Sequence, residues 1–200
     1  MRDRKELIKY YNKGGIGVEV GVLFGQFSKE ILELWDGKLY LIDIWNDTDF
    51  GYIDNNNHIH YENNLPILKT IENLKGLEDR GIMIRSTSKE ASLLFQNESL
   101  DFVHIDANHS YDSTKEDIEL WYPKVKEGGI FSVHDYILYD DYLNLPYQDN
   151  GKDKFYTNTI FGVNKAVDEF CFENKISKNL TTHEPFATFY CSKIKTKNIL

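Results

Sequence analysis

The residues Ile16-Gly-Val-Glu-Val-Gly-Val-Leu-Phe-Gly25 combine a short apolar segment with a glycine-containing turn. A helical pattern follows over residues 28–35, and the next apolar segment, Leu39-Tyr-Leu-Ile-Asp43, ends in a carboxylate. A strand, a glycine turn, a helix and a strand with an acidic end form the first half of a nucleoside-binding βαβ unit. The pattern therefore predicts a parallel sheet with a ligand at its edge.

The spacing of the glycines indicates which ligand. Gly21 and Gly25 enclose three bulky apolar residues, so the G-x-G-x-x-G turn that admits a pyrophosphate is absent. A nicotinamide dehydrogenase therefore stays only as an alternative based on the fold. S-adenosylmethionine, which has a ribose, an ammonium and a sulfonium but no phosphate, suits the turn better. We predict Glu19 near its methionine end and Asp43 on both ribose hydroxyls. The competing interpretation is that the glycines merely allow a tight turn and helix packing.

Apolar runs alternate with helical patterns along the 200 residues, which is typical of a parallel sheet covered on both faces. We expect one α/β domain over 1–200, doubly wound, with a mostly parallel seven-stranded sheet and a C-terminal antiparallel hairpin. An amphipathic helix around 4–11 lies within an N-terminal segment, 1–14. The expected strands are 16–20, 39–43, 82–85, 100–105 and 129–134, with the hairpin at 180–182 and 187–192. The expected helices are 28–35, 64–74, 89–96, 114–124 and 162–174.

Polar residues stand at the carboxyl end of each of the five expected parallel strands. Ligands of open parallel sheets bind beyond those ends, so the polar residues there predict a functional site. The residues concerned are Glu19, Gly21, Asp43, Ser86, Thr87, Asp106, His134 and Asp135.

Composition excludes some classes of function. The formal net charge is −9 and the lysines are scattered, which argues against a nucleic-acid partner. Since there is no signal-peptide core or apolar run long enough to span a bilayer, we expect a cytoplasmic protein without a membrane partner. Cys171 and Cys191 lack metal-ligand spacing and are expected to be reduced. The oligomeric state stays open.

Two further stretches carry a family resemblance: Phe102-Val-His-Ile-Asp-Ala-Asn-His-Ser-Tyr-Asp112, and Asp117 through Gly-Gly-Ile-Phe-Ser-Val-His-Asp-Tyr136. The chain resembles the class I S-adenosylmethionine-dependent methyltransferases from Gly17 to about Phe170, and within them the small-molecule and sugar O-methyltransferases typified by macrocin O-methyltransferase. The resemblance implies a Rossmann-like fold, with Ser86 and Thr87 beside the adenine. The cofactor-binding set is then Glu19, Gly21, Gly25, Asp43, Ser86, Thr87 and Asp106.

In the sugar-modifying members a divalent cation such as Mg or Mn is held by acidic residues after strands four and five. The corresponding residues here are Asp106, His134 and Asp135. His134 replaces a carboxylate, which either favours manganese, iron or zinc or abolishes metal binding.

The family's base is an aspartate, but Asn108 stands at that position and cannot take up a proton at neutral pH. His109, His134 and Asp135 are therefore the predicted catalytic residues, with the two imidazoles as candidate bases. For His109 the competing interpretation is a turn residue that caps the following helix. His104, inside a strand, is expected to be a hydrogen-bonded core residue.

The aromatic segment 136–158 directly follows the fifth expected strand and suits a sugar or an aromatic acceptor, although it could equally bury its own rings. The polar segment 45–60 suits a lid. The sequence thus predicts O-methylation of a small molecule or a saccharide hydroxyl. A catalytically silent, cofactor-binding partner subunit is the alternative from another class.

Overall fold

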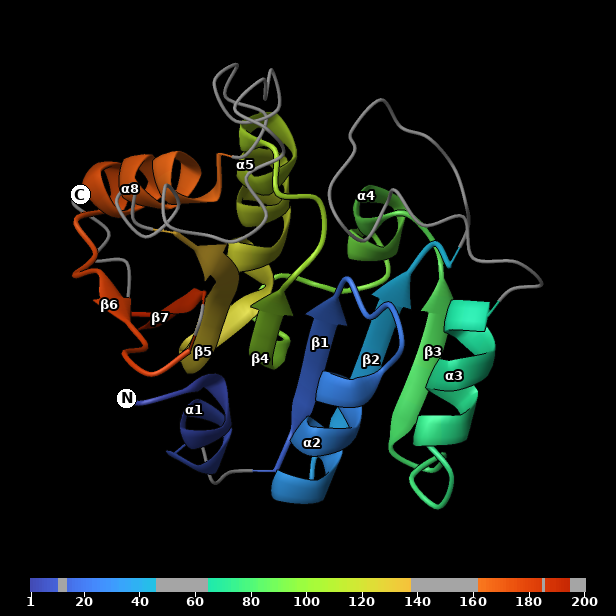
Figure 1. Ribbon diagram of the computed structural model, residues 1–200. Coiled ribbons are helices and arrows are strands. Elements are labelled where there is room, and N and C mark those ends of the chain that lie inside the picture. Colours follow the sequence, from blue (N-terminus) through green and yellow to red (C-terminus); the bar gives the residue numbers. More distant parts are fainter. Residues whose placement is uncertain (11–13, 46–64, 138–161, 185, 195–200) are drawn as a thin grey trace, which may run out of the picture.

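The computed structural model describes residues 1–10, 14–45, 65–137, 162–184 and 186–194 (Figure 1). One seven-stranded sheet has the order β3-β2-β1-β4-β5-β7-β6. The pairings between the first five strands are parallel, and β7 pairs antiparallel with both β5 and β6. The strands are β1 (Ile16–Val20), β2 (Lys38–Asp43), β3 (Gly81–Arg85), β4 (Leu100–Ile105), β5 (Val125–Tyr136), β6 (Asn179–Leu180) and β7 (Ala187–Ser192). The predicted α/β fold with a C-terminal antiparallel hairpin is confirmed.

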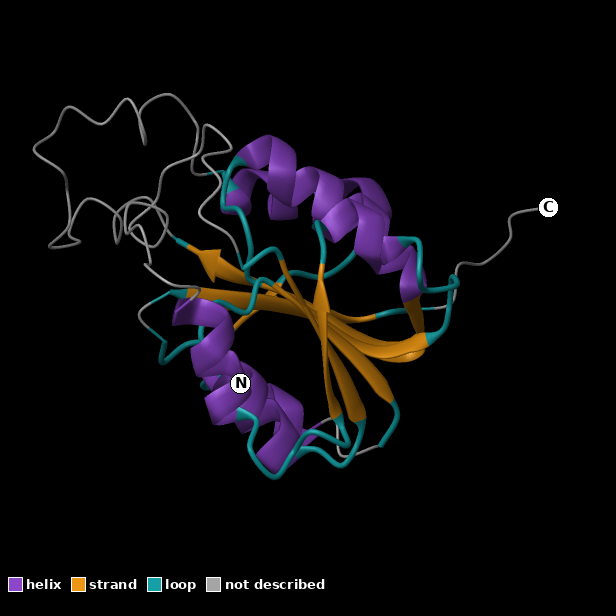
Figure 2. Ribbon diagram, turned by 90° about the vertical axis from the view of Figure 1, so that its right-hand side faces the viewer, coloured by secondary structure: helices purple, strands orange, loops and turns teal. Residues whose placement is uncertain are grey.

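Helices cover both faces of this sheet (Figure 2). The helices on one face are α1 (Arg4–Tyr10), α2 (Gln26–Leu34) and α3 (Leu65–Asn73), and those on the other are α4 (Ser88–Ser92), α5 (Tyr111–Trp121) and α8 (Val163–Asn174). A 3₁₀ turn, η2 (Tyr122–Lys124), leads from α5 into β5. None of the helices in the described ranges is long and apolar enough to cross a bilayer.

Strand β4 shows how the two cores form, because successive side chains of a strand point to opposite faces. Phe102 packs with Leu7 and Phe27 beneath α1 and α2. Val103 and Ile105 pack on the other side, in the core that α5 and α8 complete. Burial of each large apolar side chain contributes about 1.5–3 kcal/mol, so the paired cores fix the sheet between its helices.

Most element boundaries agree with the sequence prediction within a few residues, and the larger differences have local causes. Helix α5 begins at Tyr111 rather than residue 114, because the Ser110 hydroxyl accepts a hydrogen bond from the Ser113 amide and caps the helix. Strand β5 is longer than predicted, since Val125 already pairs with Leu100. Most of the predicted segments 45–60 and 136–158 lies outside the described residues.

The order of the strands reverses beside β1. The chain passes outward from β1 through β2 to β3 and then returns to place β4 on the other side of β1. Ligands of open α/β sheets bind at such a reversal, beyond the carboxyl ends of the strands. Those ends lie along one edge of the sheet (Figure 1).

Candidate active site

The glycine turn after β1 lies directly against the end of β4. The Asp106 amide donates to the Val20 carbonyl over 2.7 Å. Gly21 has a φ of +84°, and a Cβ atom there would lie 2.0 Å from the carbonyl oxygen of Asp106. Only glycine fits this position, both for its backbone conformation and for its close approach to β4. Gly25 also has a positive φ, of 72°, and precedes the first residue of α2.

Asp43, at the end of β2, holds this turn in place through hydrogen bonds. One carboxylate oxygen accepts hydrogen bonds from the amides of Val22 and Leu23, at 2.8 and 2.9 Å, and the other accepts from the Trp45 amide at 2.7 Å. A carboxylate has about four lone-pair sites, so three bonds leave room for about one more. Binding both hydroxyls of a ribose here would therefore require one of the three amides to be released.

Glu19 lies beneath the turn and is almost fully buried, at 2% exposure. The Ser28 hydroxyl of α2 donates a hydrogen bond to its carboxyl group. Burial raises the pKa of Glu19 to about 8, because removal from water disfavours the charged form. Glu19 therefore joins β1 to α2 as a largely neutral group at pH 7.

The residues after β3 have backbone partners. The Ser86 amide donates to the Asp43 carbonyl over 3.0 Å, which places Ser86 beside the ribose-binding candidate. The Thr87 hydroxyl accepts from the Glu90 amide and caps α4. Contact of Ser86 and Thr87 with an adenine stays a prediction.

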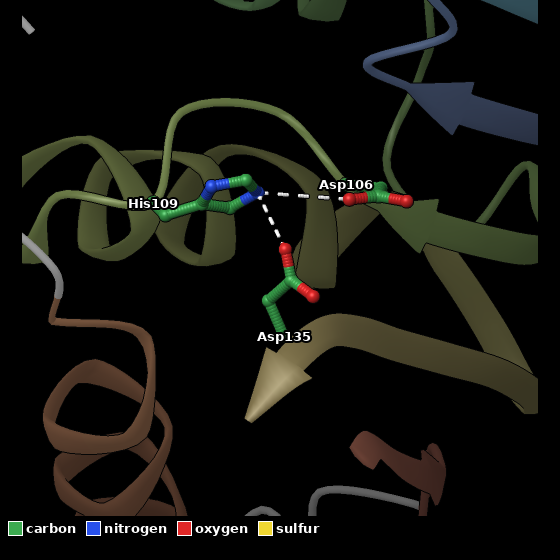
Figure 3. A group of neighbouring side chains, drawn as sticks. All are labelled: Asp106, His109 and Asp135. Carbon is green, nitrogen blue, oxygen red and sulfur yellow. Dashed lines mark ion pairs between the residues drawn. The ribbon is translucent and has the colours of Figure 1, made fainter. Parts of the chain in front are cut away.

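Three side chains from two chain segments converge at this edge of the sheet (Figure 3). Asp106 and His109 lie on the loop between β4 and α5, and Asp135 lies near the end of β5. The Nε2 atom of His109 lies 3.0 Å from Asp135 Oδ2 and 3.6 Å from Asp106 Oδ1. Burial opposes ionisation of Asp106, but the nearby His134 and the contact with His109 outweigh it and hold the pKa of Asp106 below its ordinary value. The site is therefore an imidazole nitrogen aimed between two carboxylates.

The backbone of β5 changes course at this point. Asp135 has a φ of +60°, which is uncommon for a residue other than glycine, and the β5–β7 register shifts between Val133 and Tyr136. The shift interrupts the alternation of side chains, so consecutive residues both face the site. His134 Nε2 lies 3.4 Å from Asp135 Oδ1, while His134 Nδ1 lies 2.9 Å from the Thr188 hydroxyl.

The ligand atoms of Asp106, His109 and Asp135 all lie within 4.8 Å of one another. Two carboxylate oxygens and an imidazole nitrogen fit a divalent cation such as Mn²⁺, Fe²⁺ or Zn²⁺. The predicted ligand set was Asp106, His134 and Asp135. The group of ligand atoms within this distance contains His109 instead of His134, whose Nε2 atom lies 3.4 Å from Asp135 Oδ1.

Other residues near the site have structural partners. Asn108 Oδ1 accepts a hydrogen bond from the Ser110 amide at 2.9 Å and shapes the turn before α5. The side chain that caps α5 is that of Ser110, so the capping interpretation of His109 is wrong. His104 is fully buried with Nδ1 2.9 Å from the Ser132 hydroxyl, which confirms it as a core residue.

Sequence reasoning missed Arg4. Its Nη1 atom lies 3.1 Å from Asp106 Oδ2, its Nε atom 3.4 Å from Glu184 Oε1, and its guanidinium 4.2 Å from the centre of the Phe27 ring. Helix α1 thus brings a cation into an acidic site. No local pattern signals this role, because Arg4 and Asp106 are 102 positions apart.

Comparisons with solved structures agree with this architecture. A protein from Staphylococcus aureus assigned as a caffeoyl-CoA O-methyltransferase has a TM-score of 0.64 and 16% identity, over 95% of this chain and 81% of its own. The O-methyltransferase NovP has a TM-score of 0.60 and 19% sequence identity, over 96% of this chain and 80% of its own. An O-methyltransferase from Bacillus cereus, solved with SAH, has a TM-score of 0.60 and 11% sequence identity, over 94% of this chain and 78% of its own. Structures described as rRNA methylases share the fold too.

At these identities the structural likeness shows the fold alone, and no curated protein sequence matches the chain. A family profile is more specific. The profile described as a methyltransferase domain matches residues 15–136, which is more than half of the chain and includes both the glycine turn and the Asp106/His109/Asp135 group. The resemblance to class I methyltransferases is thereby confirmed, and the chain belongs to this methyltransferase family.

Proposed function

We propose that the protein transfers a methyl group from S-adenosylmethionine to a hydroxyl group of a small molecule or saccharide. The observation that carries the proposal is the meeting of the glycine turn with the Asp106/His109/Asp135 group where the strand order reverses. Family membership supports the methyl donor, and the B. cereus O-methyltransferase of the same fold was solved with SAH.

The cofactor would lie across the ends of β1 and β2. Gly21 allows close approach to the backbone at the end of β4. Asp43 offers about one remaining acceptor position to the ribose. Glu19 and Asp106 place carboxyl groups near the expected ammonium end of the ligand.

Methyl transfer from a sulfonium is an in-line displacement, so holding the acceptor oxygen in line with the methyl carbon supplies much of the catalysis. The remaining requirement is removal of the hydroxyl hydrogen during attack. His109 Nε2 points between two carboxylate oxygens, an arrangement that favours a hydrogen or a cation on that atom. His109 therefore suits the binding of a cation or of the acceptor better than it suits the uptake of a proton.

A divalent cation, if the enzyme uses one, would be held by Asp106, His109 and Asp135. Bound there, it would make a coordinated hydroxyl more acidic. Because Asp106 Oδ2 is engaged by Arg4, its Oδ1 atom would be the coordinating oxygen.

The acceptor class is inferred from charge and from the neighbours. Three of the solved neighbours compared above carry O-methyltransferase in their names without any reference to RNA. A net charge of −9 disfavours the phosphate backbone of an RNA acceptor. A small neutral or cationic hydroxyl compound fits better.

Isothermal titration with S-adenosylhomocysteine tests the proposal. The purified protein is titrated after chelator treatment and again with added Mg²⁺ or Mn²⁺, with NAD as the control ligand. We expect micromolar binding of S-adenosylhomocysteine and none of NAD. Failure to bind S-adenosylhomocysteine under every condition would refute the methyl donor.

The same assay separates the two metal-ligand sets. A dependence on metal that is lost in His109→Gln and kept in His134→Gln would support the Asp106/His109/Asp135 group. The reverse pattern would favour Asp106, His134 and Asp135, the metal ligands that the family resemblance implies.

A further inference from the structure

Among the described residues, backbone strain gathers at the edge of the sheet where the ligand is expected. Five residues other than glycine have a positive φ, and three of them lie at this edge: Leu23 at 52°, Trp45 at 41° and Asp135 at 60°. The left-handed conformation is unfavourable for bulky side chains such as tryptophan, so surrounding contacts must hold it. Strain of this kind gathers where a segment changes conformation in function.

Asp43 accepts three backbone hydrogen bonds beside two of these residues. Its Oδ2 atom accepts from the amides of Val22 and Leu23, and its Oδ1 atom accepts from the Trp45 amide at 2.7 Å. Each carboxylate oxygen has about two lone-pair positions. Oδ2 is therefore filled, whereas Oδ1 has about one position left. For Asp43 to accept both hydroxyls of a ribose, either the glycine turn or the Trp45 amide must leave it.

The glycine turn is held on its other side by α3. The Thr70 hydroxyl shares its hydrogen between the carbonyls of Leu23 and Pro66, at 2.9 and 3.0 Å. The Asn73 side chain donates to the Phe24 carbonyl over 2.8 Å. Thr70 is completely buried. Movement of the turn would therefore break contacts with α3 as well as the bonds to the carboxylate.

In the described part of the chain, the peptide group between Ile44 and Trp45 has fewer contacts to lose. Its N–H donates to Asp43, and its carbonyl accepts from Arg85 Nε over 3.0 Å. Arg85 is exposed, so water can replace that bond at little cost. The Trp45 amide is therefore the group that a ribose can displace from the carboxylate.

A peptide plane can rotate while the side chains on either side stay in place, because φ and ψ are the soft torsions of the backbone. A rotation of 180° would take φ of Trp45 from 41° to about −140°, the value of an extended strand. The N–H would leave Asp43 Oδ1, and the Ile44 carbonyl would take its place. The indole of Trp45, which is 3% exposed and donates to the Leu23 carbonyl, would not have to move.

After this rotation two acceptors face each other, so the rotated form needs hydrogen donors between them. We propose that the cofactor's ribose rotates the Ile44–Trp45 peptide on binding, so that Asp43 Oδ1 and the Ile44 carbonyl accept its two hydroxyls. This inference rests on the proposed function and adds a backbone carbonyl to the cofactor site. The ligand shifts the population toward the rotated form, because only that form accepts both hydroxyls.

A single N–H signal reports on this peptide group. Trp45 follows an isoleucine, whereas Trp35 and Trp121, the other two tryptophans of the chain, follow leucines. Labelling the full chain with ¹⁵N-tryptophan and ¹³C-carbonyl isoleucine therefore selects the Ile44–Trp45 amide. The amides of Trp35 and Trp121 serve as controls in the spectrum recorded without the carbon filter.

We expect saturation with S-adenosylhomocysteine to speed hydrogen exchange of the Trp45 amide at least about tenfold, because this amide loses its bond to Asp43. The three-bond coupling between its amide and α hydrogens should rise toward that of an extended strand, since the coupling depends on φ. The amides of Trp35 and Trp121 should exchange at the same rate or more slowly, because a ligand stabilises the folded state. Binding that leaves either quantity unchanged at Trp45 would overturn the inference and leave the proposed function standing.

Calorimetry of two arginine variants tests the energetic consequence. Arg85→Met removes the donor to the Ile44 carbonyl and keeps an apolar stem, so it should tighten S-adenosylhomocysteine binding about two- to fivefold. Arg80→Met is the matched control, because Arg80 directly precedes β3 and donates to two backbone carbonyls away from the site, those of Leu32 and Trp35. This control should change the affinity by less than about 1.5-fold.

Unchanged or weaker binding by Arg85→Met would contradict the release of the Ile44 carbonyl and overturn the inference. If Arg85→Met does not fold, the spectra of the unmodified protein still decide. If the unmodified protein does not bind S-adenosylhomocysteine at all, the proposed function and this inference fail together.

Discussion

Replacement of the buried carboxyl group beneath the glycine turn, Glu19→Gln, should change how stability depends on pH. Glutamine has nearly the shape of a neutral glutamic acid and keeps an oxygen that can accept the Ser28 hydroxyl hydrogen. The substitution therefore removes the ionisation of Glu19 with little change in packing.

The sign follows from the raised pKa. Folding raises the pKa of Glu19 from 4.5 to about 8, so between these values the folded protein holds a proton that the unfolded chain has lost. The stability of the unmodified protein must fall as pH rises across this window, because the folded state binds more protons. At about 1.4 kcal/mol for each pH unit, the loss is at most about 5 kcal/mol by pH 8.

Urea unfolding of both proteins at intervals from pH 4.5 to 9 measures this effect. The free energy of unfolding of Glu19→Gln minus that of the unmodified protein should rise through the window by a few kcal/mol and level off above pH 8. Titrations shared by the two proteins cancel in the difference. A flat difference across the window would refute the reasoning, since Glu19 would then ionise in the folded state as it does in the unfolded chain.

Three further variants test other parts of the structure. For Asp117→Asn, the free energy of unfolding of the variant minus that of the unmodified protein should rise with pH by up to about 4 kcal/mol and level off near pH 7, because burial raises the pKa of Asp117 to about 7. Its partner Ser88 can donate to an amide oxygen as well as to a carboxyl group. A rise that continues to pH 9 would contradict this prediction. Asp43→Ala should weaken S-adenosylhomocysteine binding by about 1–3 kcal/mol in calorimetry, through an unpaired ribose hydroxyl, and an unchanged affinity would reject the ribose assignment. Gly21→Ala should destabilise the fold by at least about 2 kcal/mol in urea unfolding, since its Cβ would meet the Asp106 carbonyl oxygen at 2.0 Å, and a protein of normal stability would show that the turn can relax.

The sequence was informative about the fold because the signals involved are local. Alternating strand and helix patterns predict a parallel sheet, and the antiparallel pairing of β6 with β7 confirms the C-terminal hairpin. Element ends were less accurate, since they depend on single contacts such as the cap that Ser110 provides. The tight turn at Gly21 was likewise readable from spacing, and its close approach to β4 explains the glycine.

Residues at the ends of the strands could be named as candidates from sequence, because parallel strands bring their carboxyl ends to one edge. Their partners could not be named. The predicted metal set included His134, whereas the converging group contains His109. The side chain of Asp135 leaves a backbone with a φ of +60°. Aspartate adopts a positive φ more often than most residues, but nothing in the local sequence singles out Asp135 for it.

The sequence by itself determined the fold class, the glycine turn and the acidic character of the sheet edge, because each depends on neighbours within one element or one βαβ unit. Only the tertiary structure decided that Arg4, Glu184 and Thr188 join that edge. Arg4 and Glu184 come from opposite ends of the chain, and Thr188 reaches His134 across the β5–β7 pairing. Such contacts depend on how helix α1 and the C-terminal hairpin pack on the sheet, and the spacing of residues along the chain does not encode that packing.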